Sequence, residues 1–407
     1  MTWSRRSLLV GLGAVGLGGA GAAGLGYGWW SRAERWCGPP LEPADLDAAI
    51  DLGARYLVAA QRPAGDFVYE VDWTTGRESK SDEPIRQAGA TWGLATLVAA
   101  GHADVLPALD RSLGYWAERT TRTDAAGAAG DARAWVTVGR RRDLGAAALV
   151  GLALVDRLGS GLASPAGPTR DQRARDLDGL LASIRAARLP DGGFASAFDP
   201  DGAPTGAPNP YADGEALLLA VTAGLALDRP ALVAEALGWA RVDHQRNVDR
   251  PRAAEPDPDT TKGYYQWGSM AWYALAAAGH APDELGGWLT DLARWMIHDH
   301  GTLARTRNTA YAYEGLIPAY AWARDHGDDA LAAEIACVAN QGLGRLFSWQ
   351  LGHPRALPAL RDAADRPGAD RFVGGVQNEA AAPTLRIDVT QHQVHAALLA
   401  RTHRIVG

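Results

Sequence analysis

The sequence predicts an all-α protein built as an (α/α)6 toroid, a ring of six helical hairpins. Three observations predict this fold. Twelve stretches carry apolar residues at helical spacing, and no convincing run of strand-like alternation appears. The connections between helices are either very short or long, except for an intermediate one at 158–171, so the helices fall into pairs. The helices that follow long connections are richer in apolar and small residues, as expected of an inner ring buried on both sides.

The helical stretches are recognised by apolar residues three or four positions apart, as Leu217 and Val221 illustrate. Pro43, Pro84 and Pro282 stand near first helical positions, where a missing amide proton costs nothing. The twelve predicted helices span residues 43–60, 84–101, 105–120, 143–158, 171–188, 213–227, 229–243, 264–279, 282–299, 308–325, 328–349 and 388–402.

The long connections explain how the ring closes. Five of them open a helical pair, and the sixth precedes the last helix, which would pair with the first helix at 43–60 and join the two ends of the chain. In this arrangement all six long loops lie at one end of the toroid. That end is expected to be the rim of a funnel, and concave surfaces of this kind are where ligands bind.

Composition limits the possible classes of protein. The chain has 407 residues, of which 47% are hydrophobic and 21% charged, as in ordinary folded domains. A net charge of −7 without a basic stripe argues against nucleic-acid binding. There are only two cysteines, Cys37 and Cys337. They either pair in an oxidising compartment or remain as one exposed and one buried thiol.

The amino terminus is expected to be a targeting segment. Arg5 and Arg6 follow Ser4 and precede an uncharged, Gly- and Ala-rich stretch, so this segment resembles a twin-arginine export signal. The signal is either cleaved or retained as a membrane anchor through residues 8–30, which are long enough to span a bilayer. We therefore expect an exported protein with a signal or anchor at 1–30 and a single domain at 31–407.

Two motifs of the third long loop carry a family resemblance. Asp191-Gly192-Gly193-Phe194 forms a turn, and Asp213-Gly214-Glu215 leads into an apolar helix. This pattern resembles the hairpin repeats of (α/α)6 toroids, among them the six-hairpin glycosidases, their lyase and epimerase relatives, and the terpenoid-cyclase and prenyltransferase toroids. The resemblance covers residues 43–402 in architecture. Because these toroids host different chemistries, the function has to be argued from the site.

Carboxylates on the long loops and on the first turns of the inner helices suit sugar chemistry. Cleaving a glycosidic bond needs one or two carboxyl groups beside the bond, one of them with a raised pKa. The catalytic candidates best placed for this are Asp213, Glu215, Glu314 and Asp388. The alternative for each of them is a structural one, since a carboxylate in a first helical turn also stabilises the helix dipole and caps amides.

Aromatic and polar side chains on the same loops would form the walls of a sugar site. The substrate-binding candidates are Arg86, Trp92, Tyr211, Tyr265, Gln266, Trp267, Tyr311, Tyr313 and His392. Each aromatic residue could instead belong to the core. Arg86 could hold an acidic sugar or a carboxylate substrate, or could pair structurally with Asp82 and Glu83.

We predict no metal site and no cofactor. His392, His395 and Asp388 lie on one predicted helix and form the strongest metal-like group, but metal and nucleotide motifs are otherwise missing from the sequence. The function expected is an exported, monomeric carbohydrate-active enzyme, a hydrolase, lyase or epimerase, acting on an oligosaccharide or a cell-envelope glycan. The alternative is a non-catalytic toroid that binds a glycan, a peptide or a partner protein. In that case every rim carboxylate should be paired with arginine or with helix amides.

Overall fold

The computed structural model describes residues 37–123, 132–163 and 166–405. The predicted signal or anchor at 1–30 lies outside these residues. Each of the twelve predicted helices overlaps one helix of the structure, with ends that differ by five residues or fewer. Within the described ranges, no helix is both long and apolar enough to cross a membrane.

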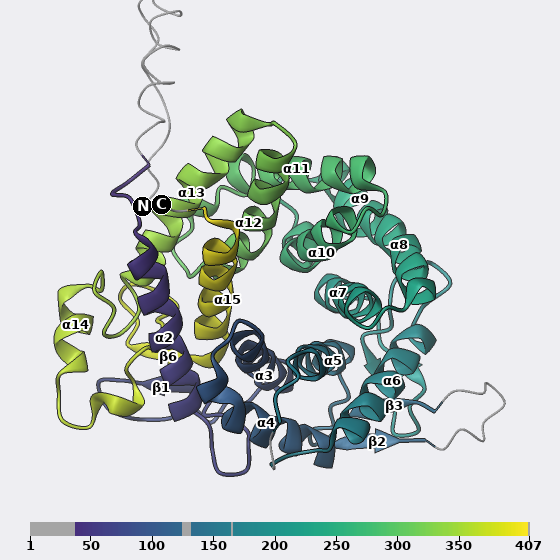
Figure 1. The fold of residues 1–407 in the computed structure, drawn as a ribbon, viewed down its shortest axis with the longest axis horizontal. Coiled ribbons are helices and arrows are strands. Elements are labelled where there is room, and N and C mark those ends of the chain that lie inside the picture. The colour runs from purple at the N-terminus through teal and green to yellow at the C-terminus, as the bar shows by residue number, and fades with distance from the viewer. Residues whose placement is uncertain (1–36, 124–131, 164–165, 406–407) are drawn as a thin grey trace, which may run out of the picture.

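The helices form two concentric rings, which confirms the (α/α)6 toroid (Figure 1). The inner ring consists of α3 (Pro84–Ala99), α5 (Leu144–Gly159), α7 (Pro210–Ala226), α10 (Asp259–Ala277), α12 (Ala310–Asp325) and α15 (Ile387–His403). The outer ring consists of α4 (Leu106–Glu118), α6 (Arg170–Ala186), α8 (Pro230–His244), α11 (Pro282–His298), α13 (Asp329–Phe347) and α2 (Pro43–Ala59).

Burial separates the two rings as the sequence pattern predicts. The inner helix α5 buries 14 of its 16 residues, whereas the outer helix α11 buries only 7 of its 17 residues. An inner helix packs against its two ring neighbours and its outer partner, so almost no face of it meets solvent.

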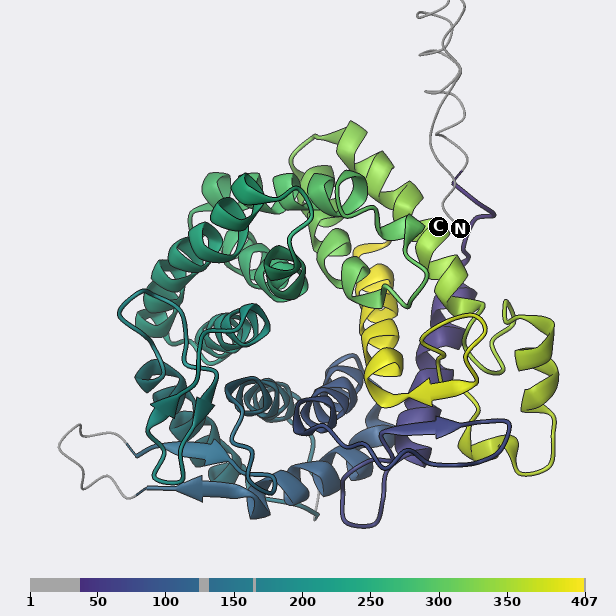
Figure 2. The ribbon, with the colours of Figure 1, turned by 180° about the vertical axis from the view of Figure 1, so that it is seen from behind.

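Two segments from opposite ends of the chain close the ring. Helix α15 lies between α12 and α3, with α2 on its outer side (Figures 1 and 2). Strand β1 (Glu70–Asp72) of the first long loop pairs antiparallel with β6 (Thr384–Arg386) of the last. The two cysteines form a disulfide, Cys37–Cys337, which bridges 300 residues and ties the first described residue to α13.

The long loops contain short elements that the sequence pattern did not reveal. Two further antiparallel ribbons are present, β2 (Thr120–Arg122) with β3 (Ala134–Val136), and β4 (Ala197–Phe198) with β5 (Pro204–Thr205). The additional helical turns of the long loops are η2 (Gln245–Asp249), α9 (Arg250–Ala254), η3 (Thr302–Ala304), α14 (Pro358–Ala364) and η4 (Ala369–Arg371), and one further turn, η1 (Ala103–Val105), lies in the short connection between α3 and α4. Elements of two to seven residues are too short to show a hydrophobic period.

The long loops contact one another at one end of the toroid, as expected. Asp143 of the second loop bridges to Ala197 of the third, and Arg307 of the fifth bridges to Glu379 of the sixth. Helices α7 and α10 begin three and five residues earlier than predicted, and Pro210 is the first residue of α7. These added turns bring Tyr211 and Lys262 onto the wall of the rim.

Candidate active site

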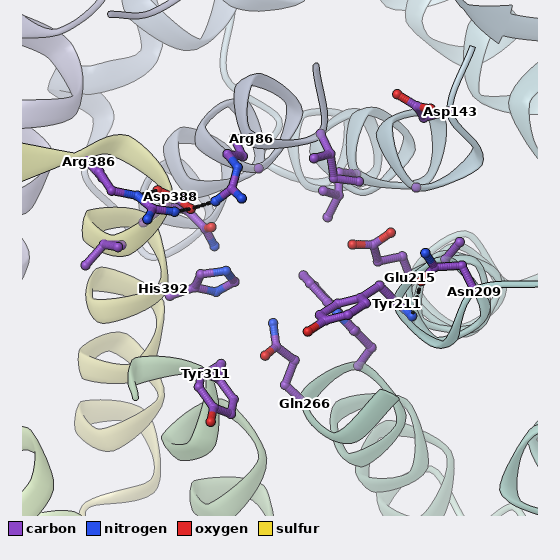
Figure 3. Close-up of a pocket in the computed structure, with 18 of the residues that line it drawn as sticks. Arg86, Asp143, Asn209, Tyr211, Glu215, Gln266, Tyr311, Arg386, Asp388 and His392 are labelled. Carbon is purple, nitrogen blue, oxygen red and sulfur yellow. Dashed lines mark hydrogen bonds and ion pairs between the residues drawn. The ribbon is translucent and has the colours of Figure 1, made fainter. Parts of the chain in front are cut away.

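A cavity of about 630 Å³ opens among the first turns of the inner helices, and we call it the rim cavity. Its wall includes side chains from all six inner helices and from the loops that lead to them (Figure 3). Eight of the sequence-predicted site residues border it: Arg86, Tyr211, Glu215, Gln266, Trp267, Tyr311, Asp388 and His392.

Glu215 borders the rim cavity from α7 and is only 3% exposed. Its Oε2 atom has no hydrogen-bond partner among the described residues. It occupies the space beside Gly145, where an added Cβ would stand 2.1 Å from it. Burial, and then the negative charge of Asp143, raise the pKa of Glu215 well above its usual value. The environment therefore favours a neutral carboxylic acid that can donate a proton.

His392 borders the cavity from α15, on the opposite side of the toroid centre (Figure 3). Its Nδ1 atom lies 2.9 Å from Oε2 of Glu314, which is fully buried. Burial alone would lower the pKa of His392, but the carboxylates of Glu314 and Asp388 outweigh it and the pKa is raised. Because Nδ1 is occupied, Nε2 is the ring nitrogen left for a ligand or a proton transfer.

Glu314 contacts two histidines at once, one through each carboxylate oxygen. Its Oε1 atom lies 2.9 Å from Nδ1 of His395, one turn along α15 from His392. Burial alone would raise the pKa of Glu314, but the two imidazoles outweigh it and the pKa is lowered. Glu314 does not border the rim cavity, so any effect it has on a bound ligand passes through His392.

Asp388 is held between two arginines. Arg386 donates through Nε, at 3.0 Å from Oδ1, and through Nη2, and Arg86 donates through Nη1 to Oδ2 of the same carboxylate. Burial alone would raise the pKa of Asp388, but Arg386 and then Arg86 outweigh it and the pKa is lowered. Asp388 therefore remains an anion that positions Arg86. The predicted alternative, a pair of Arg86 with Asp82 or Glu83, is not formed, and Glu83 pairs with Arg141.

Asp213 lies away from the rim cavity, in the wall of the toroid. The Phe194 amide donates to its Oδ1 at 3.0 Å, and Asn247 Nδ2 donates to its Oδ2 at 3.1 Å. Burial raises the pKa of Asp213, and these hydrogen bonds oppose the rise. The carboxylate thus holds the Asp-Gly-Gly-Phe turn against α7, which is the structural alternative that its sequence position allowed.

Three predicted aromatic residues also lie outside the cavity wall. Tyr265 and Tyr313 are fully buried, and their rings fill the space beside Gly315 and Gly342, where a Cβ would clash. Both therefore pack helix against helix. Trp92 lies deeper in the toroid, with its ring centroid 5.8 Å from that of Trp267, which borders the cavity.

The cavity wall includes residues that we did not select from the sequence. Asp143 precedes α5, Asn209 caps α7, and Lys262 lies in the first turn of α10. All three lie where a long loop leads into an inner helix. Their place at such a junction could have identified them as site residues from the sequence. Within the described ranges, no group of three or more His, Cys, Asp or Glu side chains is arranged to hold a metal ion.

No protein-family model matches the chain, and no curated protein matches it in sequence. Among solved structures, it is similar to an inactive variant of a GH76 α-1,6-mannanase of Salegentibacter sp. HEL1_6 in complex with α-1,6-mannotriose. The identity is 11% and the TM-score 0.58, over 88% of this chain and 99% of that chain.

Two further structures are similar over nearly their whole length. A D-mannose isomerase matches at 12% identity and a TM-score of 0.55, over 89% of this chain and 99% of that chain. A GH76 α-mannanase of Bacteroides thetaiotaomicron matches at 10% identity and a TM-score of 0.55, over 88% of this chain and 96% of that chain. At such identities the likeness is one of fold, and the fold these structures share with the chain is the (α/α)6 toroid.

Proposed function

We propose that the protein is an exported carbohydrate-active enzyme that hydrolyses a glycosidic bond in an oligosaccharide or a cell-envelope glycan bound in the rim cavity. One observation carries the proposal. A buried carboxyl group with an unpartnered oxygen, Glu215, borders the cavity on the side opposite the carboxylate-bound imidazole of His392. Such a pair, one acid and one base, is what bond cleavage between two sugars requires.

In the proposed reaction the sugar lies between α7 and α15. Glu215 gives its proton to the glycosidic oxygen of the departing sugar. His392 takes a proton through Nε2 from a water molecule, whose oxygen bonds to the anomeric carbon as the bond to the departing sugar breaks. Acid and base act from opposite sides, so the configuration at the anomeric carbon is inverted. Glu314 holds the imidazole in position and stabilises its protonated form.

The solved structures of similar fold are consistent with this chemistry. Two of the proteins are named as mannanases, one is crystallised with an oligosaccharide, and a third is named as a mannose isomerase. The variant bound to mannotriose is described as inactive after replacement of two consecutive aspartates, so carboxyl groups matter for that mannanase. For the present chain, catalysis by a carboxyl group is part of our proposal.

The alternative, a toroid that only binds, makes a prediction about the rim carboxylates. It expects each of them to be neutralised by arginine or by amides. Asp213 and Asp388 meet that expectation, whereas Oε2 of Glu215 has no hydrogen-bond partner among the described residues. This difference favours an enzyme.

Export is part of the proposal and rests on the twin-arginine-like sequence at Ser4–Arg6. The Cys37–Cys337 disulfide supports it, because disulfides persist mainly outside the reducing cytoplasm.

The test is to incubate the purified protein in H₂¹⁸O with neutral and acidic oligosaccharides and to follow new reducing ends by mass spectrometry. We expect cleavage of one class of glycan with one ¹⁸O atom incorporated per bond, abolished by Glu215→Gln and strongly reduced by His392→Asn. Glu118→Gln, on the exposed surface of α4, is the matched control and should cleave normally. Binding without cleavage by the unmodified protein would instead support the toroid that only binds.

A further inference from the structure

The rim cavity is more cationic than the protein that contains it. The whole chain has a net charge of −7, yet four cationic side chains border the cavity within the described ranges, against three carboxyl groups. The cations are Arg86, Arg141, Lys262 and Arg386, and the carboxyl groups are Asp143, Glu215 and Asp388. Arg141 is paired with Glu83, a carboxylate that does not border the cavity. Because the environment of Glu215 favours its neutral form, the three remaining cations face only the carboxylates of Asp143 and Asp388.

The pairing of these groups leaves positive charge without a full counter-charge on two sides of the cavity, beside α3 and α15 and at the start of α10. Arg86 and Arg386 share the single carboxylate of Asp388, so two guanidinium groups are balanced by one negative charge. Lys262 lies 3.8 Å from a fully exposed carboxylate, Asp259, a distance too long for a hydrogen bond. An ion pair with so exposed a partner is weak in water.

Arg86 has unused hydrogen-bonding capacity. Its side chain forms one hydrogen bond among the described residues, from Nη1 to Asp388, and its buried Nε has no partner. The guanidinium also lies over the ring of Tyr69, 5.3 Å from the ring centroid, which fixes its plane. Figure 3 shows Arg86 reaching from α3 to Asp388 beside His392. The side chain as a whole is 35% exposed, so a guanidinium held in this way can bind the oxygens of an anionic group in the cavity.

Neighbouring amides add more donors than acceptors. Within the described ranges, Nδ2 of Asn308 and Nε2 of Gln391 are buried without hydrogen-bond partners, as is Nε1 of Trp267. All three residues border the rim cavity. Buried donors without partners are costly. A small rotation of these side chains toward the cavity would let the acceptor oxygens of a ligand satisfy them.

From this excess of charge and donors we propose that the rim cavity recognises an anionic sugar, and that a carboxylate or sulfate group of the glycan binds to Arg86 beside Asp388. The inference rests on the proposed function, since it names the class of substrate for the same cavity. Asp388 positions Arg86 for this contact. Asp388 provides one negative charge for the two guanidinium groups of Arg86 and Arg386, and the anionic group of the sugar would provide the second.

Calorimetry on a matched panel tests the proposal. The probes are oligouronates, the same oligouronates with their carboxyl groups methyl-esterified, sulfated glycosaminoglycan fragments, and neutral mannan, glucan and xylan oligosaccharides. We expect binding of an uronate or of a sulfated fragment, which separates the two sources of the anion. Methyl esterification or desulfation should abolish the binding, and Arg86→Gln should weaken it roughly tenfold or more, as for the loss of a hydrogen bond to a charged group.

Two variants serve as controls for the arginine. Arg307→Gln removes a rim arginine that is 76% exposed and does not border the cavity, so it should leave the affinity unchanged. Arg86→Lys keeps the positive charge without the planar guanidinium and should lose less affinity than Arg86→Gln. If Arg86→Gln does not fold, a loss of affinity in Arg86→Lys still tests the proposal.

The failure of this inference can be distinguished from the failure of the proposed function. If only neutral oligosaccharides bind, with affinities that Arg86→Gln does not change, the anionic specificity is wrong and the carbohydrate function stands. If no saccharide of either kind binds, both are wrong.

Discussion

The imidazole of His392 and the carboxylate of Glu314 are joined by a 2.9 Å contact between Nδ1 and Oε2, although 78 residues separate them in the chain. The second oxygen of the same carboxylate binds His395 at the same distance. One buried anion thus orients two rings on adjacent turns of α15. The imidazole of His392 borders the rim cavity, whereas Glu314 does not. The negative charge of Glu314 therefore acts on the site through His392.

Replacing Glu314 with glutamine should lower the pKa of His392, because burial is then opposed only by the weaker effect of Asp388. Histidine titration followed by NMR measures the change. If His392 is the base, the acidic limb of the pH–rate profile should move to lower pH and the maximal rate should fall. Glu334→Gln is the matched control, since Glu334 contacts His298 at 3.1 Å on the outer ring. An unchanged pKa of His392 in Glu314→Gln would contradict the conclusion that Glu314 raises the pKa of His392.

Glu215→Gln should stabilise the protein at neutral and alkaline pH. The pKa of Glu215 is raised in the folded state above about 4.3, the value expected in the unfolded chain. Between these two pKa values the folded state binds more protons than the unfolded state, so stability falls as pH rises, by about 1.4 kcal/mol per pH unit. Glutamine does not ionise and removes this loss.

The measurement is the midpoint of thermal unfolding from pH 4 to pH 9. The difference between Glu215→Gln and the unmodified protein should grow with pH, whereas Glu118→Gln on the surface should show no such trend. A constant difference would mean that Glu215 is not held in its neutral form.

Gly145→Ala should impair the site through contact with Glu215. The new Cβ would stand 2.1 Å from Oε2 of Glu215 and 2.6 Å from Cδ1 of Ile85, so the carboxyl group must move. We expect activity to fall roughly tenfold or more, because small displacements of a catalytic group are costly. Overpacking should also lower the free energy of unfolding by about 1–3 kcal/mol.

Gly287→Ala is the matched control for this substitution. Gly287 lies within α11 and an added Cβ meets no atom within 4 Å. Alanine should therefore stabilise the helix by roughly 0.5–1 kcal/mol and leave activity unchanged. If both substitutions affect activity equally, the space beside Gly145 is not what positions Glu215.

Reduction of the Cys37–Cys337 disulfide should destabilise the folded protein. The bond closes a loop of 300 residues, and removing a cross-link of this kind typically costs about 2–4 kcal/mol, mainly by freeing the unfolded chain. Denaturant unfolding with and without a reductant measures the loss. A double variant, Cys37→Ser with Cys337→Ser, should have the stability of the reduced protein and should not respond to reductant.

The pairing and order of the helices could be read from the sequence because they depend on local patterns. Apolar residues at helical spacing marked twelve helices, and the alternation of short and long connections paired them. The same reasoning placed the long loops at one end and so located eight of the thirteen selected site residues on the rim cavity. It left the state of the two cysteines open, because their separation of 300 residues says nothing about their distance in space.

Which carboxylate faces the cavity was decided only by the tertiary structure. Asp213 and Glu215 are two residues apart in the first turns of α7, so they point in directions roughly 200° apart around the helix. An outer helix reveals its direction by its polar face, but an inner helix is apolar all round and has no such reference. The packing of α7 against its neighbours turns Asp213 toward the Asp-Gly-Gly-Phe turn and Glu215 toward the rim cavity. The sequence by itself therefore determined the ring and its rim, and tertiary packing decided which side chains enter the site.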